Sequence, residues 1–552
     1  GNILDSEVNL LASSLPQYQI CMDTRTQALH QGGDTLFYRY VDSIADGLSR
    51  IIGDQSSGQY RARMIHSFKK RDKEGRPGSY LRLSRQNLSY IQKKEIEKLP
   101  LIRLGVYKSG VQFEEQKLRI KPFGSLASKT LGSVNKETGH GSTGLEKRFD
   151  AELTGKDGFG TRQRIGGRWE LVTTKETEDG MDIVTNINTH LQDIVESELR
   201  TRLEITQSDW GCCILMETHS GKIVAISNLD RGKDGLYYEM KNHAVMRVEP
   251  GSTFKTISIM VALDDGKVDL YDTVSVHANG WHYFNATHTD SHPKDTVYTT
   301  RSAMAISSNI ALAKIITRGY EGSAKKFVKR IEKIGLKDSL DWEILGAQKA
   351  LINVPSDTVT LSRMSYGYSV ELTPLQILMF YNAIANDGKM IQPYLVSEIQ
   401  KNGKTIKQFS SKVVTSNICS RSTLNDVRLC LHDVVWDDTL GTASWRWWAG
   451  KRYARKAQSD LVHIAGKTGT AQILRDGRYR GKDRQHRMTF VGYFPEEDPQ
   501  YTCICMMEYP KTYGYDSGFD CGGVVRCIAE KTVAKMGNYV IRKDTTQLKI
   551  NH

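Results

Sequence analysis

The chain has 552 residues, of which 39% are hydrophobic and 25% are charged, so we expect two or three soluble globular domains. No apolar run approaches the roughly 18–20 residues of a membrane span. The net charge of +13 favours an anionic partner, but neither a helix-turn-helix pattern nor an aromatic RNA-binding signature accompanies it. We therefore expect no nucleic-acid partner, and we interpret the basic stretch at residues 61–85 as a solvated surface.

The first region, residues 1–180, is polar and is expected to contain strands, loops and one or two helices. Helical spacing of apolar residues predicts one helix over residues 41–52 and a second over residues 87–99. Glycine-rich sequence follows from residue 121, where glycines are typical of turns. Because no grouping of His, Cys and carboxylates suggests catalysis, we interpret this region as a non-catalytic platform domain.

The second region, residues 181–545, has predicted strands near both of its ends and mostly helical sequence between them, up to about residue 400. Such a pattern favours an α+β domain in which one antiparallel sheet is assembled from both ends of the region and is flanked by helices. The predicted elements are a strand at 182–188, a helix at 189–205, strands at 211–217, 223–227, 488–494 and 501–508, and a last helix at 521–535.

A serine and a lysine stand three residues apart where a helix is expected to begin after Pro250 and Gly251. Residues i and i+3 share one face of a helix, so Ser252 and Lys255 would point into the same space. A serine needs an adjacent base to become a nucleophile, and a lysine can be that base when burial or nearby positive charge lowers its pKa. The spacing alone is common by chance, so further motifs are needed.

Two further motifs follow in order. Ser307-Ser308-Asn309 precedes an apolar helical run, and Lys467-Thr468-Gly469 follows strand-like sequence at residues 461–465. Ser-x-x-Lys, a Ser-x-Asn triplet and Lys-Thr-Gly, in this order along the chain, are together the signature of penicillin-binding proteins and class A β-lactamases.

Over essentially its whole length the sequence resembles a class B penicillin-binding protein, a monofunctional peptidoglycan transpeptidase. Leu126-Ala127-Ser128-Lys129-Thr130-Leu131-Gly132 and Gly144-Leu145-Glu146 resemble motifs of the N-terminal platform, or dimerisation-type, domain of that family, and Thr373-Pro374-Leu375-Gln376 resembles a helical landmark of its transpeptidase domain. Glu249-Pro250-Gly251-Ser252-Thr253-Phe254-Lys255 is more similar to the division-specific (FtsI) type than to the elongation type.

The resemblance implies a role for each site residue. Ser252 would be the acylated nucleophile, Lys255 its base, Ser307 a proton relay to the leaving amine, and Asn309 a group that positions Lys255 and the substrate amide. Lys467, on an edge strand, would supply positive charge for the terminal carboxylate of a D-Ala-D-Ala stem, with hydrogen bonds from Thr468 and Thr470. Gly469 would allow close approach of the substrate, and the backbone N–H groups of Ser252 and Thr470 would form the oxyanion hole. The alternatives for single residues are that Ser307 caps a helix and that Lys467 is an ordinary solvated lysine.

The resemblance also implies the setting of the reaction. Peptidoglycan stem peptides would be the substrates and β-lactams would acylate the same serine, with no cofactor and no metal. The opening Gly1-Asn2-Ile3-Leu4-Asp5 resembles the segment just after a membrane anchor. We therefore expect a single-pass anchor in the native protein, a location on the periplasmic side of the bacterial inner membrane, and a SEDS-type glycosyltransferase and divisome proteins as partners.

Other functions use the same motifs. An elongation-type transpeptidase, a D,D-carboxypeptidase, a β-lactamase, or a β-lactam sensor or scaffold that does not turn over would all keep this fold. Nothing in the sequence resembles the Glu-containing loop that serves deacylation in β-lactamases, and a large platform domain argues against that class. Intact motifs argue against a scaffold.

Two features depart from the family pattern: residues 444–456, and Cys521 to Cys527 near the last predicted helix, for which the sequence suggests no function. Residues 444–456 interleave tryptophan with arginine and lysine, and we interpret them either as a loop whose tryptophans cover the core or as a contact for glycan or a partner protein. Nine cysteines occur without a Cys-x-x-Cys pair or a suitably spaced histidine pair, so we expect no zinc site. Cys419 with Cys430, or Cys521 with Cys527, could pair in an oxidising compartment.

Overall fold

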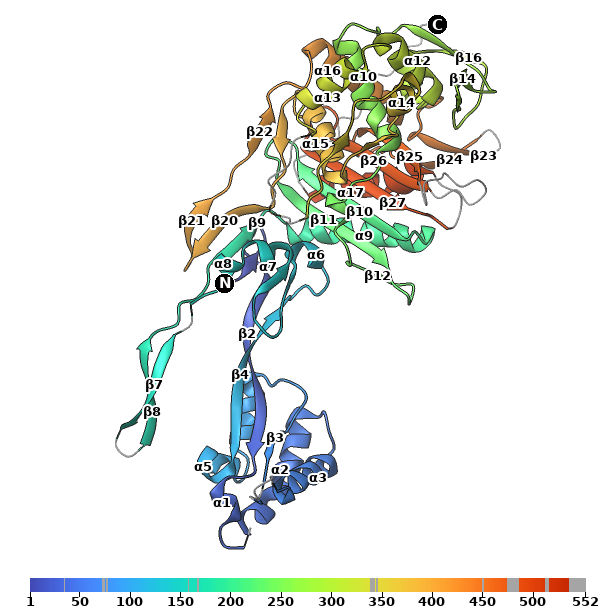
Figure 1. Ribbon diagram of the computed structural model, residues 1–552. Helices are drawn as coiled ribbons and strands as arrows, with labels where there is room; N and C mark the ends of the chain where they lie inside the picture. Colours follow the sequence, from blue (N-terminus) through green and yellow to red (C-terminus); the bar gives the residue numbers. More distant parts are fainter. Residues whose placement is uncertain are drawn as a thin grey trace, which may run out of the picture. The chain divides into compact units, whose positions relative to one another are not determined.

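The computed structural model contains two compact units, Ala12–Pro122 and a larger unit that combines Gly1–Leu11 with the described residues from Phe123 onward (Figure 1). Each unit has a hydrophobic core of its own and is described separately. The structure describes residues 1–33, 35–71, 75, 78–156, 158–165, 168–337, 343, 346–448, 451–473, 486–511 and 516–535.

The smaller unit packs two helices, α2 (Thr35–Ile52) and α3 (Ser57–Lys69), against an antiparallel sheet. The long strand β2 (Leu10–Asp23) pairs with both β3 (Tyr80–Arg82) and β4 (Val111–Ile120). The apolar faces of the helices and of β2 share one buried cluster, which supplies most of the stability of such a unit. Three shorter helical segments complete it: α1 (Gln27–His30), η1 (Ile102–Leu104) and α5 (Val106–Ser109).

Both helices predicted for the first region are confirmed. The first, α2, extends further toward the N-terminus than the predicted residues 41–52. The second is α4 (Tyr90–Glu97), which is shorter than the predicted residues 87–99 because Ser89 caps its first turn in a capping box with Gln92.

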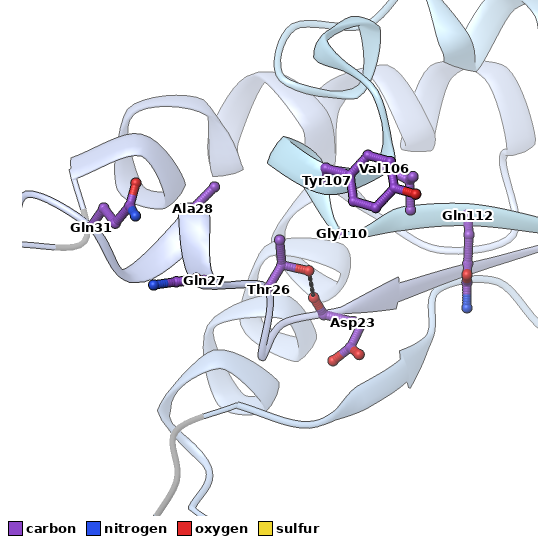
Figure 2. A pocket seen from close by; sticks show the side chains of 9 residues that line it. All are labelled: Asp23, Thr26, Gln27, Ala28, Gln31, Val106, Tyr107, Gly110 and Gln112. Atoms are coloured by element: carbon purple, nitrogen blue, oxygen red, sulfur yellow. Dashed lines mark hydrogen bonds between the residues drawn. The ribbon is translucent and has the colours of Figure 1, made fainter. Parts of the chain in front are cut away.

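A pocket of about 530 Å³ lies where β2 ends and α1 begins (Figure 2). Its lining includes Asp23, Gln27 and Tyr107, and the Thr26 hydroxyl donates a hydrogen bond of 2.8 Å to the Asp23 carbonyl. None of the site residues predicted from the sequence lines this pocket, so we assign it no part in their chemistry.

The larger unit is built on a six-stranded antiparallel sheet with the strand order β12-β11-β10-β27-β26-β25. Cys213 of β10 lies opposite Ser227 of β11 on one side and Cys505 of β27 on the other, so early and late parts of the chain meet in the sheet centre. The predicted assembly of one sheet from both ends of the region is confirmed. The strands are β10 (Trp210–Glu217), β11 (Ile223–Arg231), β12 (Tyr237–Tyr238), β25 (Ala465–Gln472), β26 (His486–Phe494) and β27 (Tyr501–Glu508).

Helices cover both faces of this sheet (Figure 1). On one face, α9 (Thr189–Thr206) and α17 (Ser517–Lys535) pack in one core with Cys503 and alternate residues of the strands. On the other face lies α15 (Pro374–Ala385), whose Asn382 donates to the hydroxyl of Thr502, the neighbour of Cys503. Because successive strand residues point to opposite faces, the two contacts place the helices on opposite sides. The structure therefore has the layered α+β architecture predicted from the sequence.

The remaining elements of the larger unit are mostly short. The helices are α6 (Ser128–Leu131), α7 (Gly144–Arg148), α8 (Asp150–Leu153), η2 (His243–Val245), η3 (Gly251–Thr253), α10 (Phe254–Asp264), α11 (Thr300–Ala305), α12 (Asn309–Tyr320), α13 (Ala324–Lys333), α14 (Thr358–Met364) and α16 (Arg421–Trp436). The strands β1 (Ile3–Leu4), β9 (Asp182–Thr185), β20 (Val396–Lys401) and β21 (Lys404–Gln408) pair with one another. Two-stranded pairs are β5 (Ser133–Val134) with β6 (Gly141–Thr143), β7 (Phe159–Ile165) with β8 (Arg168–Lys175), β13 (Thr273–Val276) with β16 (Thr296–Thr299), β14 (Trp281–Tyr283) with β15 (Ala286–His288), β17 (Leu351–Ile352) with β18 (Val370–Glu371), β19 (Met390–Gln392) with β22 (Lys412–Thr415), and β23 (Trp445–Trp448) with β24 (Lys451–Arg455).

The predicted helix at 189–205 and last helix at 521–535 are confirmed, although α17 begins earlier, at Ser517. The strand predicted for residues 182–188 ends at Thr185. The strand-like reading of residues 461–465 is wrong for all but Ala465, because the strand β25 begins there and contains the Lys-Thr-Gly motif itself.

All nine cysteines are free thiols, so neither of the two pairs considered from the sequence is formed in this structure. Cys212, Cys213, Cys503 and Cys505 are buried in the central strands, as predicted. Across the described ranges of the chain, no helix is both long enough and apolar enough to span a bilayer.

Candidate active site

Ser252 lies in the one-turn helix η3, which leads directly into α10. Two glycines allow other segments to approach this turn closely. Gly251 has φ +55°, and a Cβ there would lie 3.0 Å from the Cβ of Ala471 in β25. Gly367 has φ +93°, accepts a hydrogen bond of 3.2 Å from the Gly251 N–H, and leaves no room for a Cβ, which would lie 2.0 Å from the Gly251 carbonyl oxygen. The turn that carries Ser252 is thus held between β25 and the 366–368 segment.

The helix after this turn is buried almost all round, from Phe254 to Ala262. A helix that is apolar on every side is a core helix, so its one lysine must lie inside the domain. Lys255 is fully buried, whereas Ser252 at the preceding turn is half-buried and keeps access to solvent. The buried Lys255 amine therefore lies one helical turn from the accessible Ser252 hydroxyl.

The structure brings the three predicted motifs together. Lys255 Nζ donates to the Ser307 carbonyl oxygen at 2.5 Å and to Ser307 Oγ at 3.1 Å. Lys467 Nζ donates to the same Oγ at 2.9 Å, and also to the Thr468 carbonyl oxygen at 3.0 Å. One hydroxyl thus connects two lysines that lie far apart in the sequence.

Burial sets the protonation of these amines. It lowers the pKa of Lys255 to about 7, and the negative charge of Asp290 opposes that shift. Burial also lowers the pKa of Lys467 well below its usual value, and the positive charge of Lys255 adds to the effect. A lysine with a pKa near 7 is substantially neutral at physiological pH, so Lys255 can accept a proton from a neighbouring hydroxyl.

Ser307 has an unusual backbone conformation for a serine, with φ +61°. Non-glycine residues rarely occupy this left-handed region, and the strain is often found at functional sites. The helix-capping alternative for Ser307 is wrong, because the cap of α12 is Ser308, whose hydroxyl accepts from the Ala311 N–H at 3.0 Å. Ser307 precedes the helix, and its hydroxyl accepts hydrogen bonds from the amines of both lysines.

Asn309 is the first residue of α12, and its side-chain nitrogen donates to the Thr289 carbonyl oxygen at 2.8 Å. Its backbone N–H donates to Asp290 at 2.6 Å. These hydrogen bonds run to the 289–290 segment and not to Lys255, which the resemblance had implied as a partner.

The third motif lies on β25, which is an edge strand of the six-stranded sheet, as expected. The Thr468 hydroxyl lies 2.7 Å from that of Thr442, and the Thr470 hydroxyl lies 3.1 Å from that of Ser517. At Gly469 a Cβ would lie 2.9 Å from Thr253 Cγ2. The packing of β25 on the Ser252 turn therefore also favours glycine at this position, and the substrate contact expected from the sequence stays a prediction.

Four residues that contact the site were not predicted from the sequence. Thr289 and Asp290 contact the Ser307–Asn309 turn, and Thr442 and Ser517 pair with the threonines of β25. Each is a single polar residue with no fixed spacing from its partner motif. Only the three-dimensional pairing reveals them.

The tryptophan- and arginine-rich insert is a hairpin of β23 and β24 rather than a loop. Basic side chains of the insert form ion pairs with neighbouring carboxylates: Arg452 contacts Asp438 at 2.6 Å, and Lys456 contacts Asp516 at 3.3 Å. The Lys456 amine also donates to the Thr442 carbonyl oxygen at 3.0 Å, so the base of the hairpin adjoins the residue that pairs with Thr468.

A buried lysine with a lowered pKa, an accessible serine one turn away and a second lysine on an edge strand are the parts expected of a serine acyltransferase site. Comparison with known proteins agrees. Residues 211–528 match the family described as penicillin binding protein transpeptidase domain, and residues 1–185 match the penicillin-binding protein dimerisation domain.

The chain is 26% identical over 435 residues to the probable peptidoglycan D,D-transpeptidase PbpC of Pseudomonas aeruginosa, covering 77% of this chain and 71% of the relative. It is 25% identical over 473 residues to the peptidoglycan D,D-transpeptidase FtsI homolog of Mesostigma viride, covering 77% and 74%. The crystal structure of penicillin-binding protein 2X from Streptococcus thermophilus has the same fold, with a TM-score of 0.77 at 22% identity over 97% of this chain and 79% of that one. The chain therefore belongs to the penicillin-binding proteins, of class B, and its site lies in a transpeptidase domain.

Proposed function

We propose that the chain is a peptidoglycan D,D-transpeptidase that works through an acyl-enzyme on Ser252. Neutral Lys255 takes the Ser252 proton as the serine oxygen attacks the carbonyl carbon between the two D-Ala residues of a stem peptide. The D-Ala amine leaves with a proton relayed through Ser307. An amine of a neighbouring stem peptide then attacks the ester, forms the cross-link and frees the serine. The observation that carries this proposal is the pair of buried amines on the Ser307 hydroxyl.

The other motif residues bind substrate in this proposal. Lys467 meets the terminal carboxylate, helped by the hydroxyls of Thr468 and Thr470, and Asn309 positions the substrate amide. A carboxylate close to Lys467 favours its protonated form, which offsets the effect of burial on its pKa. The N–H groups of Ser252 and Thr470 stabilise the oxyanion, a contribution of roughly 10²–10³ in rate for one such donor.

Labelling with a fluorescent penicillin tests the chemistry. The wild type should become covalently labelled and release the label slowly, and the Ser252→Ala variant should stay unlabelled. Rapid release would indicate a β-lactamase. An unlabelled, folded wild type would refute the acyl-enzyme and leave the scaffold alternative.

We further propose that the enzyme acts in septal wall synthesis, anchored on the periplasmic side of the inner membrane with a SEDS-type glycosyltransferase and divisome partners. The division-type sequence around Glu249 supports this role. The Glu249 carboxylate accepts a hydrogen bond of 3.2 Å from the Ser369 N–H, two residues after Gly367. A fluorescent fusion should gather at mid-cell in dividing bacteria. An even distribution along the side wall would favour the elongation type.

Residues 1–180 are the platform domain in this proposal, and residues 181–545 are the catalytic domain. The β23–β24 hairpin contacts the glycan strand or a divisome partner. Deleting residues 445–455 should reduce cross-linking of polymeric substrate, or partner binding, while penicillin labelling persists. Unchanged cross-linking and partner binding would remove this role.

A further inference from the structure

Asp290 makes three hydrogen bonds to the turn that carries Ser307. Its Oδ2 accepts from the Ser308 hydroxyl at 2.7 Å, and its Oδ1 accepts from the N–H groups of Asn309 and Ile310 at 2.6 and 3.0 Å. The preceding carbonyl, of Thr289, accepts from the Asn309 side chain at 2.8 Å. Two consecutive residues therefore fix the start of α12, and a carboxylate at a helix N-terminus is also favoured by the helix dipole.

Hydrogen bonds of the preceding residue, His288, also position the 289–290 segment. His288, at the end of β15, is buried with one ring nitrogen 2.8 Å from the Tyr366 hydroxyl and the other 3.0 Å from the Ser362 hydroxyl. Burial lowers the pKa of His288 to about 4, so the ring is neutral and can donate one of these bonds and accept the other. Tyr366 adjoins Gly367, which abuts the turn of Ser252.

The contacts form a closed ring around the site. It runs from the Ser252 turn through Gly367 and Tyr366 to His288, and along the chain to Asp290. From there it passes through Ser308 to the adjacent Ser307, whose hydroxyl accepts from Lys255. We propose that Asp290 is a positioning residue for the reaction proposed above: its carboxylate holds the Ser307–Asn309 turn in the strained form that places the Ser307 hydroxyl between the amines of Lys255 and Lys467. The inference rests on the proposed function, since it concerns the same acylation.

The charge of Asp290 has a separate effect, because it favours protonated Lys255 and so opposes the effect of burial. The positive charge of Lys255 in turn lowers the pKa of Lys467. Other charged side chains near α10 form ion pairs with one another: Arg330 of α13 pairs with Asp264 and Asp265 at the end of α10, and Arg301 of α11 pairs with Asp433 of α16. Asp290 thus holds the turn and also raises the pKa of Lys255 against the larger effect of burial.

Two substitutions separate these roles. Asp290→Asn keeps an oxygen acceptor for the two backbone N–H groups and removes the charge, so acylation by fluorescent penicillin should persist and its acid limb should move to lower pH. Asp290→Ala removes the acceptor as well, so the Ser307 turn relaxes and acylation should fall about 10²-fold across the pH range. Asn188→Ala, which removes the cap of α9 on the far face of the sheet, controls for loss of a helix cap and should label at the wild-type rate.

The readouts keep the two proposals distinct. An unlabelled wild type would overturn both proposals. A labelled wild type together with Asp290 variants that label at its rate, with an unmoved pH profile, would overturn only the role of Asp290. Melting temperatures identify a variant that merely unfolds; if Asp290→Ala does so, the Asp290→Asn pH profile still decides, because a purely structural role would not shift it.

Discussion

The smaller unit and the active site place their basic side chains in opposite environments, one exposed and the other buried. In the smaller unit, Arg61 contacts Asp42 at 2.5 Å with both side chains more than half exposed, 53% and 65%. In the larger unit, Lys255 and Lys467 are fully buried, and the hydrogen bonds described for their amines go to hydroxyl and carbonyl oxygens rather than carboxylates. Exposed ion pairs contribute little to stability, whereas burying an amine away from a carboxylate costs free energy. Burial, rather than the net charge of +13, therefore identifies the amines that the proposed chemistry uses.

The largest expected effect comes from Lys255→Met. Removing the general base should lower the rate of acylation by fluorescent penicillin by roughly 10²–10⁴-fold. The matched surface variant, Arg61→Met, should label at the wild-type rate, because its charge lies on an exposed side chain of the smaller unit. Equal labelling of the two variants would break the comparison between buried and exposed cations.

The next effect is the pH dependence of acylation in the wild type. Lys255 acts as a base only when it is unprotonated, and its pKa is about 7, so the rate should rise with pH through neutrality and level off above it. Below pH 7 the rate should fall by about tenfold per pH unit. Acylation rates measured from pH 5 to 9 give the profile, and a rate independent of pH would remove Lys255 as the base.

A smaller effect tests the close packing around Ser252. Gly367→Ala adds a Cβ at φ +93° against the Gly251 carbonyl oxygen, so both the melting temperature and the acylation rate should fall, the rate by about tenfold. Gly346→Ala is the matched control, because its φ is +88° and no atom of the residues that the structure describes lies within 4 Å of the added Cβ. Both variants carry the backbone strain, so only the contact distinguishes them. Equal loss in the two would show that the packing of the turn does not matter.

The smallest effect concerns the surface pair. Arg61→Ala should change the free energy of unfolding by less than about 0.5 kcal/mol, because both partners are largely exposed and solvent screens the interaction. Chemical denaturation measures the change. A loss of several kcal/mol would mean that this exposed ion pair contributes substantially to the stability of the unit, contrary to the comparison.

Periodicity predicted the sheet and its flanking helices well, because buried strands such as β10 and β27 and the apolar side of α9 have clear patterns. The ends of elements were less predictable. At residues 461–465 the apolar run is typical of a strand, but the hydrogen-bonded pairing starts only at Ala465 and continues through Lys467 into polar sequence. The pairing of the edge strand β25 depends on its neighbour β26, so the local composition of β25 does not predict where the pairing begins.

The motif residues of the site were predictable because Ser252 and Lys255 have fixed spacing on one helix. The supporting residues were not. Asp290 precedes Ser307 in the chain without belonging to any motif, in a segment whose position depends on the buried contacts of His288. The strained φ of Ser307 was likewise hidden, since a serine before an apolar run is typical of a helix cap, and Ser308 takes that place instead.

The sheet drawn from both ends of the domain has a consequence for how the protein folds. β10 pairs with β27, which comes last among the strands, so the central ladder is a contact of very high sequence separation, and such contacts form slowly. A chain synthesised only as far as α16 contains Ser252, Lys255 and Ser307 but has neither Lys467 nor the strand that carries it. If Ser252 is the nucleophile, as proposed, it is therefore synthesised before the strand that completes its site, and acylation requires β25 to have joined the sheet.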